Sequence, residues 1–261
     1  MIQHYNDVDQ KLHQLSQVIA KFNRSFVPQK EDDSHTNLQY DIIGNRILGR
    51  WIDTSKGKVI VSLNIITLHF SVYNQKWEVV FEASVIDKTQ EEIENSFLPF
   101  CNDYHLSFDT FKTPLHFEIE TYSFLKNKYT ALPTDGIEEW KKWRKTAFET
   151  CGLLLEHLQL KSEIRIWPHH FDTGIYVEVN SEMSFGFGLA MKDNVCEMPY
   201  FYFSAYGIHQ HKMNYDNFPP LQVGCWKNLS HWKGAVLEID QISKEKLSSF
   251  IIEVKQNYFS N

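Results

Sequence analysis

Two short clusters of histidine and aspartate carry the residue types that can do chemistry in this chain. The first is the Trp-Pro-His-His-Phe-Asp segment at 167–172, and the second is the His-Gln-His segment at 209–211. If each segment is extended, alternate side chains share a face. Imidazole nitrogen and carboxylate oxygen suit zinc or another divalent first-row metal. The predicted metal ligands are His170, Asp172, His209 and His211.

A metal held by these side chains would support hydrolysis, because a bound ion generates hydroxide from water. The alternative interpretation is structural. The chain contains 12 His, so close pairs arise by chance, and no His-Glu-x-x-His motif or Cys/His framework accompanies them. Histidine at the end of a strand then forms hydrogen bonds at the surface or in the core. The sequence leaves both interpretations open.

An alternation of tyrosine and phenylalanine at 200–203 suggests an aromatic ligand pocket. Phe201 and Phe203 are predicted to face the core, which places Tyr200 and Tyr202 on the opposite face, where their hydroxyls reach water or a ligand. A long irregular stretch follows, and long loops are often binding loops or lids. The predicted lining is Tyr200, Tyr202, Trp226 and Trp232, with His209 and His211 at the mouth, and His170 and Asp172 complete the ligand-binding set. The alternative is that this loop packs its own tryptophans as a cap on the sheet.

The segment Ser-Phe-Gly-Phe-Gly-Leu-Ala at 184–190 is predicted to be a strand rather than a nucleotide-binding turn. It lacks the third glycine and the following helix of a dinucleotide site. In a strand, the rings at 185 and 187 share one face, and Gly186 and Gly188 share the other. A flat glycine face can hold a stacked ring from this protein or from a ligand. The chain also lacks a Gly-x-Ser-x-Gly elbow and a P-loop, so no motif specifies a reaction.

Composition and charge exclude several classes of protein. The formal net charge of −7 argues against a nucleic-acid-binding protein, which needs clustered Lys and Arg. The four cysteines lie far apart, as in reduced proteins rather than disulfide scaffolds. We predict no secretory signal after Met1 and no membrane span, because no apolar run reaches about 18 residues. The expected location is the cytoplasm, and the expected partner is a small molecule or another protein.

The elements expected to position these residues alternate between helices and short-linked strands. Apolar residues at helical spacing predict helices over 7–22, 89–97, 135–158 and 243–259. Thr89 and Glu92 have the spacing of a capping box. Runs rich in Val, Ile and aromatic residues predict strands at 58–63, 68–73, 77–81, 114–120, 163–167, 175–179, 183–190, 200–205 and 235–239.

This element order predicts an α+β fold, with mainly antiparallel sheet covered by three or four helices. Residues 1–126 would form an N-terminal α+β half and residues 135–261 a C-terminal α+β half of similar plan. The similarity rests on element order alone, without a residue-level repeat. We expect one compact unit, although separate domains stay open as an alternative.

The C-terminal half resembles a bacterial family of domains of unknown function. The residues that carry the resemblance are the Trp-Pro-His-His-Phe-Asp segment at 167–172, Gly-Phe-Gly at 186–188, Pro-Tyr-Phe-Tyr at 199–202 and the segment 234–240. The resemblance covers roughly 100 residues and implies a strand-rich block, but it implies no activity. The residues themselves favour a small-ligand or partner-binding protein, with a metal-assisted hydrolase as the alternative.

Overall fold

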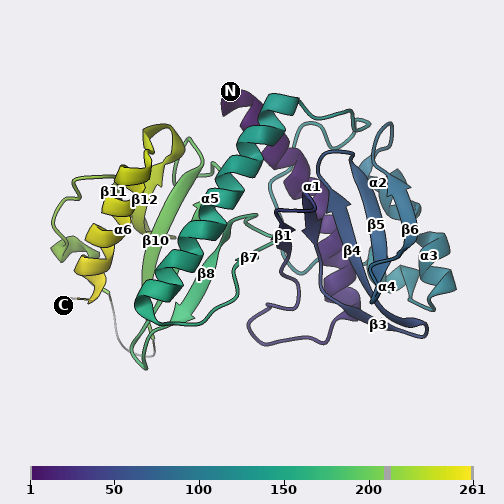
Figure 1. Ribbon diagram of the computed structural model, residues 1–261, viewed down its shortest axis with the longest axis horizontal. Coiled ribbons are helices and arrows are strands. Elements are labelled where there is room, and N and C mark those ends of the chain that lie inside the picture. The colour runs from purple at the N-terminus through teal and green to yellow at the C-terminus, as the bar shows by residue number, and fades with distance from the viewer. Residues whose placement is uncertain (1, 209–212, 260–261) are drawn as a thin grey trace. The chain divides into compact units, whose positions relative to one another are not determined.

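The computed structural model of the chain describes residues 2–208 and 213–259 (Figure 1). It has the predicted α+β fold class, with two antiparallel sheets and flanking helices. The chain divides into two compact units, the first built from residues 1–142 and 165–171 and the second from residues 143–164 and 172–261. Within the described residues, no helix is both long enough and apolar enough to cross a membrane.

The first unit begins with α1 (Ile2–Phe26), which extends the predicted helix at both ends. Its apolar stripe is fully buried, as the helical period requires. Val8, Leu12, Leu15, Ile19 and Phe22 are all 0% exposed. This stripe packs against a central strand of the first sheet, β4 (Gly57–Asn64).

The first sheet is an antiparallel meander with six strands. They are β1 (Gln39–Asp41), β2 (Arg46–Leu48), β3 (Ile52–Thr54), β4, β5 (His69–Asn74) and β6 (Val79–Ser84). The order is β1-β2-β4-β5-β6, and β3 pairs with β4. The sequence predicted β4, β5 and the first half of β6, whereas β1, β2 and β3 are too short to give a periodic signal.

Three short helices close the first unit and bury phenylalanine against α1. The Thr89–Glu92 capping box predicted for α2 (Gln90–Asn95) is confirmed, because the Thr89 side chain accepts from Glu92 N–H and the Glu92 carboxylate accepts from Thr89 N–H. Helices α3 (Leu98–Asp103) and α4 (Phe108–Lys112) were not predicted. The ring centroids of Phe22 and Phe111 lie 4.3 Å apart, so these short helices are held by aromatic packing.

The strand predicted at 114–120 is wrong. Leu115, Phe117 and Ile119 are half-buried between exposed neighbours, so the alternation is real, but the segment forms no ladder. At its start the Arg24 guanidinium donates to the carbonyl oxygens of Thr113 and Pro114, at 2.6 and 2.8 Å. A side chain therefore satisfies backbone groups that a neighbouring strand would otherwise pair.

A buried polar network holds α1 to the Trp-Pro-His-His-Phe-Asp segment. His13, which is 3% exposed, places Nε2 2.9 Å from the carbonyl oxygen of Pro168 and Nδ1 2.7 Å from the Tyr122 hydroxyl. Because a carbonyl only accepts, Nε2 carries a hydrogen and donates to Pro168, while Nδ1 and the Tyr122 hydroxyl share the second hydrogen bond. Gln17 donates to the same carbonyl at 2.8 Å, and Phe171 stacks on the imidazole at 5.2 Å. Both ring nitrogens therefore have partners.

The same segment is joined to the first unit by a short strand, β7 (Arg165–Ile166). Leu38 and Ile166 exchange two backbone hydrogen bonds, of 2.9 and 2.8 Å. The sequence predicted a longer strand at 163–167, and the structure keeps only its centre.

The second unit holds the other antiparallel sheet, with strands ordered β8-β9-β10-β12-β11. They are β8 (Thr173–Glu178), β9 (Met183–Ala190), β10 (Tyr200–Gly207), β11 (Cys225–Asn228) and β12 (Lys233–Glu238). The stretch 207–234, predicted as irregular, contains β11 and a 3₁₀ turn, η1 (Tyr215–Asn217). Strand β11 is short and mostly exposed or half-buried, which explains why no apolar pattern marks it.

Phenylalanine fills the face of this sheet that packs against helix. Phe185, Phe187, Phe201 and Phe203 are all 0% exposed. Phe203 meets Tyr258 of α6 (Lys244–Phe259) with ring centroids 5.4 Å apart. Cys151 of α5 (Thr134–Leu158) lies 3.6 Å from the Phe187 carbonyl oxygen, so α5 also borders this core. Both helices lie where the sequence predicts them.

We expect His13→Ala to lower the free energy of unfolding by about 3 kcal/mol, because it removes two buried hydrogen bonds and leaves a cavity. The matched control is His116→Ala, since the His116 side chain is 52% exposed and its ion-pair partner among the described residues is Asp33. The control should cost less than about 0.5 kcal/mol. Urea titration measures both values, and equal losses in the two variants would contradict the network.

Candidate functional site

The Trp-Pro-His-His-Phe-Asp segment is a turn, not an extended strand end. The Phe171 N–H donates to the Trp167 carbonyl oxygen at 2.7 Å, and Phe171 has a φ of +52°. This left-handed conformation is unusual for a bulky residue. The expected alternation, with His170 and Asp172 on one face of an extended chain, is therefore wrong. His170 is exposed and Asp172 is buried.

Two of the four predicted metal ligands, His170 and Asp172, lie within the described residues. His209 and His211 lie outside the described residues. Among the residues that the structure does describe, no group of three or more His, Cys, Asp or Glu side chains is arranged to hold a metal ion. The metal site, with His170 and Asp172 as its described members, stays a prediction.

Tyrosine collects on the face of the second sheet that lies opposite the phenylalanines. Residues of one parity in β10 point to this face, and the registers Tyr202↔Gly188↔Gly174 and Ser204↔Gly186↔Tyr176 extend it across β9 and β8. We call it the tyrosine face, and it consists of Tyr176, Tyr200, Tyr202 and Tyr206. The sequence predicted this orientation for Tyr200 and Tyr202, and the buried Phe201 and Phe203 confirm it.

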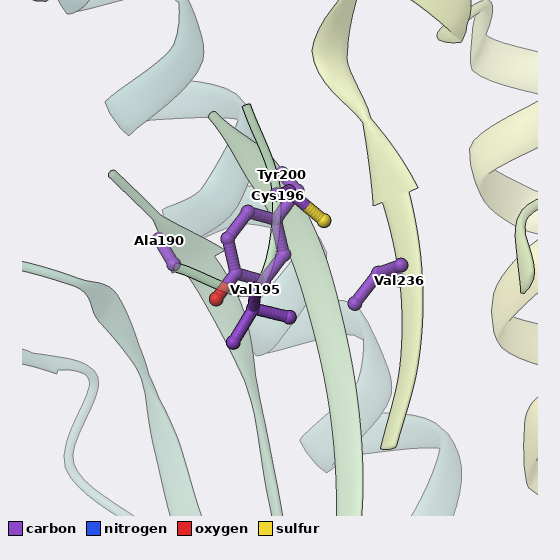
Figure 2. Close-up of a cluster of buried hydrophobic side chains, with 5 residues drawn as sticks. All are labelled: Ala190, Val195, Cys196, Tyr200 and Val236. Atoms are coloured by element: carbon purple, nitrogen blue, oxygen red, sulfur yellow. The ribbon is translucent and has the colours of Figure 1, made fainter. Parts of the chain in front are cut away.

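One end of the tyrosine face is closed by apolar packing. Figure 2 shows Tyr200 with Ala190, Val195, Cys196 and Val236, all buried, and Tyr202 and Trp232 pack against this cluster. The rings of Tyr200 and Trp232 meet at 6.4 Å. The structure therefore brings together three of the predicted aromatic residues, Tyr200, Tyr202 and Trp232.

An aspartate turn fixes Tyr200 at this closed end. The Tyr200 hydroxyl donates to Asp193 at 2.9 Å, and the other carboxylate oxygen of Asp193 accepts from Val195 N–H at 2.8 Å. Burial, and then the charge of Asp193, raises the pKa of Tyr200. Burial also raises the pKa of the Cys196 thiol to about 12. Both groups keep their protons at neutral pH.

The chemical centre of the face is a hydrogen bond between Tyr202 and Asp172. The Tyr202 hydroxyl donates to Asp172 Oδ2 at 2.5 Å, and Asp172 is 8% exposed. Asp172 Oδ1 is buried and has no hydrogen-bond partner among the described residues. Burial, and then the Asp172 charge, raises the pKa of Tyr202 well above its ordinary value. Native structures rarely leave such an oxygen unpaired, so it requires an explanation.

Glycines beneath the rings allow this geometry. A side-chain carbon at Gly174 would lie 2.9 Å from the Tyr202 hydroxyl oxygen, and one at Gly186 would lie 3.5 Å from the Tyr202 ring and 3.7 Å from Tyr206. The tyrosine rings thus lie over a floor without side chains. Of the flat glycine face predicted at Gly186 and Gly188, Gly186 lies beneath rings of this protein, whereas a side-chain carbon at Gly188 would meet the backbone of residues 173 and 174.

The other end of the face is open. Tyr176 and Tyr206 are 45% and 41% exposed, and their ring centroids lie 6.2 Å apart. The Tyr176 hydroxyl donates to Ser184 at 2.8 Å. Large exposed rings beside a buried carboxylate combine apolar contact with polar recognition, as ligand sites do.

Trp226 does not belong to this face. It lies opposite Ala235, which lies opposite Phe203, so its side chain takes the phenylalanine side of the sheet. There it stacks on Phe218 at 4.8 Å and contacts Tyr258 at 5.5 Å. The structure therefore separates Trp226 from the other predicted pocket residues, and this part of the loop packs its own tryptophan as the alternative interpretation proposed.

Sequence reasoning missed Tyr176, Tyr206 and Asp193 as members of the site. The alternation that marks Tyr200 and Tyr202 continues to Tyr206, and Tyr176 alternates with apolar residues in the run Gly-Ile-Tyr-Val-Glu. Both signals were available. Nothing local, in contrast, indicates that Asp193 meets Tyr200.

Comparisons of the chain with family models, with curated proteins and with solved structures find no match. The resemblance of the C-terminal half to a bacterial domain family therefore stays a prediction. Functional inference rests on the geometry of the tyrosine face.

We expect Tyr202→Phe to lower the free energy of unfolding by about 2 kcal/mol, because it leaves the buried Asp172 carboxylate without its donor. Tyr176→Phe is the matched control, since it removes a hydroxyl from a ring that is 45% exposed. The control should lose less than about 1 kcal/mol. Urea denaturation of both variants checks this, and a loss in Tyr202→Phe no greater than in the control would refute the assigned bond.

The raised pKa of Tyr202 also predicts an alkaline dependence of stability. Its stabilising contribution is complete below the unfolded pKa of about 10, and it is lost as pH rises further, because the unfolded chain then releases a proton that the native state keeps. The slope for one such group is about 1.4 kcal/mol per pH unit. Between about pH 9 and about pH 11, the free energy of unfolding should therefore fall less steeply with pH in Tyr202→Phe than in the wild type. Equal slopes of the free energy of unfolding against pH in the two proteins would contradict the raised pKa of Tyr202.

Proposed function

We propose that this protein binds a small organic molecule on the tyrosine face of its second unit. The observation that carries the proposal is the buried Asp172 oxygen without a hydrogen-bond partner among the described residues, beside exposed tyrosine rings. A ligand that donates a hydrogen bond to this oxygen would remove the cost of burying it unpaired. The tyrosines would contact the rest of the molecule.

The groups around the face suit recognition better than catalysis. Burial raises the pKa of the Cys196 thiol, at the closed end of the face, to about 12, so it stays protonated and is a poor nucleophile. Tyr202 likewise keeps its proton, because its pKa is raised. With these groups held neutral, the face offers aromatic surface, hydroxyls and one carboxylate.

The proposed place of action is the cytoplasm. All four cysteines, Cys101, Cys151, Cys196 and Cys225, are free thiols. Free thiols are usual in reducing compartments, whereas secreted proteins tend to carry disulfides. The net charge of −7 supports a partner other than nucleic acid.

Binding of small aromatic fragments tests the site. In a protein with isotope-labelled tyrosine rings, we expect fragments to shift the resonances of Tyr202 and Tyr206, with dissociation constants of about 1 mM. Tyr206→Ala should weaken binding severalfold, because it removes an exposed wall of the site. Trp77→Ala is the matched control, since Trp77 is a 47% exposed ring in the first unit. Equal binding by both variants, or no shift of any tyrosine resonance, would reject the site.

A further inference from the structure

The geometry points to a ligand that carries a primary ammonium group, bound by Asp172 and Tyr202. This inference rests on the proposed function and deepens it, because it names the chemical class of the molecule. The charge of Asp172, the acceptor oxygens of Asp172 and Tyr202, and the surrounding rings each favour this group.

Charge is the first argument. Asp172 is 8% exposed and forms no ion pair with any Lys, Arg or His of the described residues. Its only described hydrogen-bond donor is the neutral Tyr202 hydroxyl. A buried carboxylate without a cation is costly. A cationic ligand would supply the missing charge, whereas an anionic ligand would be repelled.

Counting donors and acceptors favours a primary ammonium over a neutral alcohol. The Tyr202 hydroxyl donates its single hydrogen to Asp172 Oδ2, and its oxygen keeps lone pairs that can accept a hydrogen bond. Asp172 Oδ1 can also accept a hydrogen bond, and it has no partner among the described residues. A primary ammonium has three donors and can reach both oxygens. A neutral alcohol has one donor and satisfies only one of them.

The rings complete the match. The ring centroids of Tyr176 and Tyr206 lie 6.2 Å apart with an interplanar angle of 43°, and Tyr202 and Tyr206 both lie over Gly186. A cation near tyrosine faces gains cation–π attraction, and the organic body of the ligand gains apolar contact. Tyr206 is 41% exposed, and we expect its ring to turn aside as the ammonium approaches Oδ1.

The test compares matched amines and alcohols on the full chain. Benzylamine and benzyl alcohol share one ring and one linker, and differ in the group that would meet Asp172. We expect benzylamine to bind about tenfold more tightly near neutral pH, because its hydrogen bond to the carboxylate is charge-assisted. Tyrosine ring resonances report both titrations.

Asp172→Asn should remove this preference, because the amide keeps the size of the side chain and loses its charge. Asp240→Asn, a change at an exposed aspartate of the same unit, should retain it. If Asp172→Asn does not fold, Tyr202→Phe keeps the carboxylate and frees Asp172 Oδ2 as an acceptor, so the preference for the amine should persist, and its loss would overturn the inference. A preference that survives in a folded Asp172→Asn variant would overturn the inference.

The outcomes separate the two proposals. Equal binding of amine and alcohol at the tyrosine face would overturn the ammonium and leave the binding site standing. No shift of any tyrosine resonance by either fragment at several times the expected dissociation constant of about 1 mM would overturn both.

Discussion

The hydrogen bond from Tyr202 to Asp172 is the interaction on which the second unit's open face depends. It reaches across Gly174, where any side-chain carbon would lie 2.9 Å from the tyrosine oxygen. The register Tyr202↔Gly188↔Gly174 therefore sets which glycines lie beneath the ring. The neighbouring strands bring Tyr176 and Tyr206 to the same face, so the exposed rings of the second unit share this face with the bond and its glycine floor.

The two units contain buried polar side chains that differ in pairing, His13 in the first and Asp172 in the second. In the first, His13 has a partner at each ring nitrogen, and the Pro168 carbonyl accepts from both His13 and Gln17. Both ring nitrogens of His13 are therefore paired within the first unit, whereas Gln17 Oε1 has no hydrogen-bond partner among the described residues. In the second, Asp172 has one oxygen paired and one oxygen without a described partner. This difference is why the functional proposal lies with the carboxylate and not with the buried histidine.

Sequence periodicity predicted the long helices, the longer strands and the orientation of Tyr200 and Tyr202, because these features repeat over many residues. It failed where the decisive contact is remote or the element is short. The alternation at 114–120 reports burial correctly, yet the segment pairs with no strand, and Arg24 binds the carbonyl oxygens where it begins. Trp226 was assigned to the pocket because β11 is too short to reveal its parity. The pairing of Tyr202 with Asp172 joins residues 30 positions apart, and local pattern cannot show it.

The segment that looked richest in chemistry illustrates how composition can mislead. Its histidines suggested an extended ligand pair, but the left-handed Phe171 closes a turn, and the backbone carbonyl of Pro168 makes the buried contacts. His169 packs on Phe117 at 5.3 Å, and His170 is exposed. Of the described residues in this segment, Asp172 is the one whose side chain forms a buried hydrogen bond in the second unit. Asp172 directly follows this turn, and its side chain is held by the hydroxyl of Tyr202, a residue far from it in sequence, which leaves Oδ1 available for a role that the fold itself does not require.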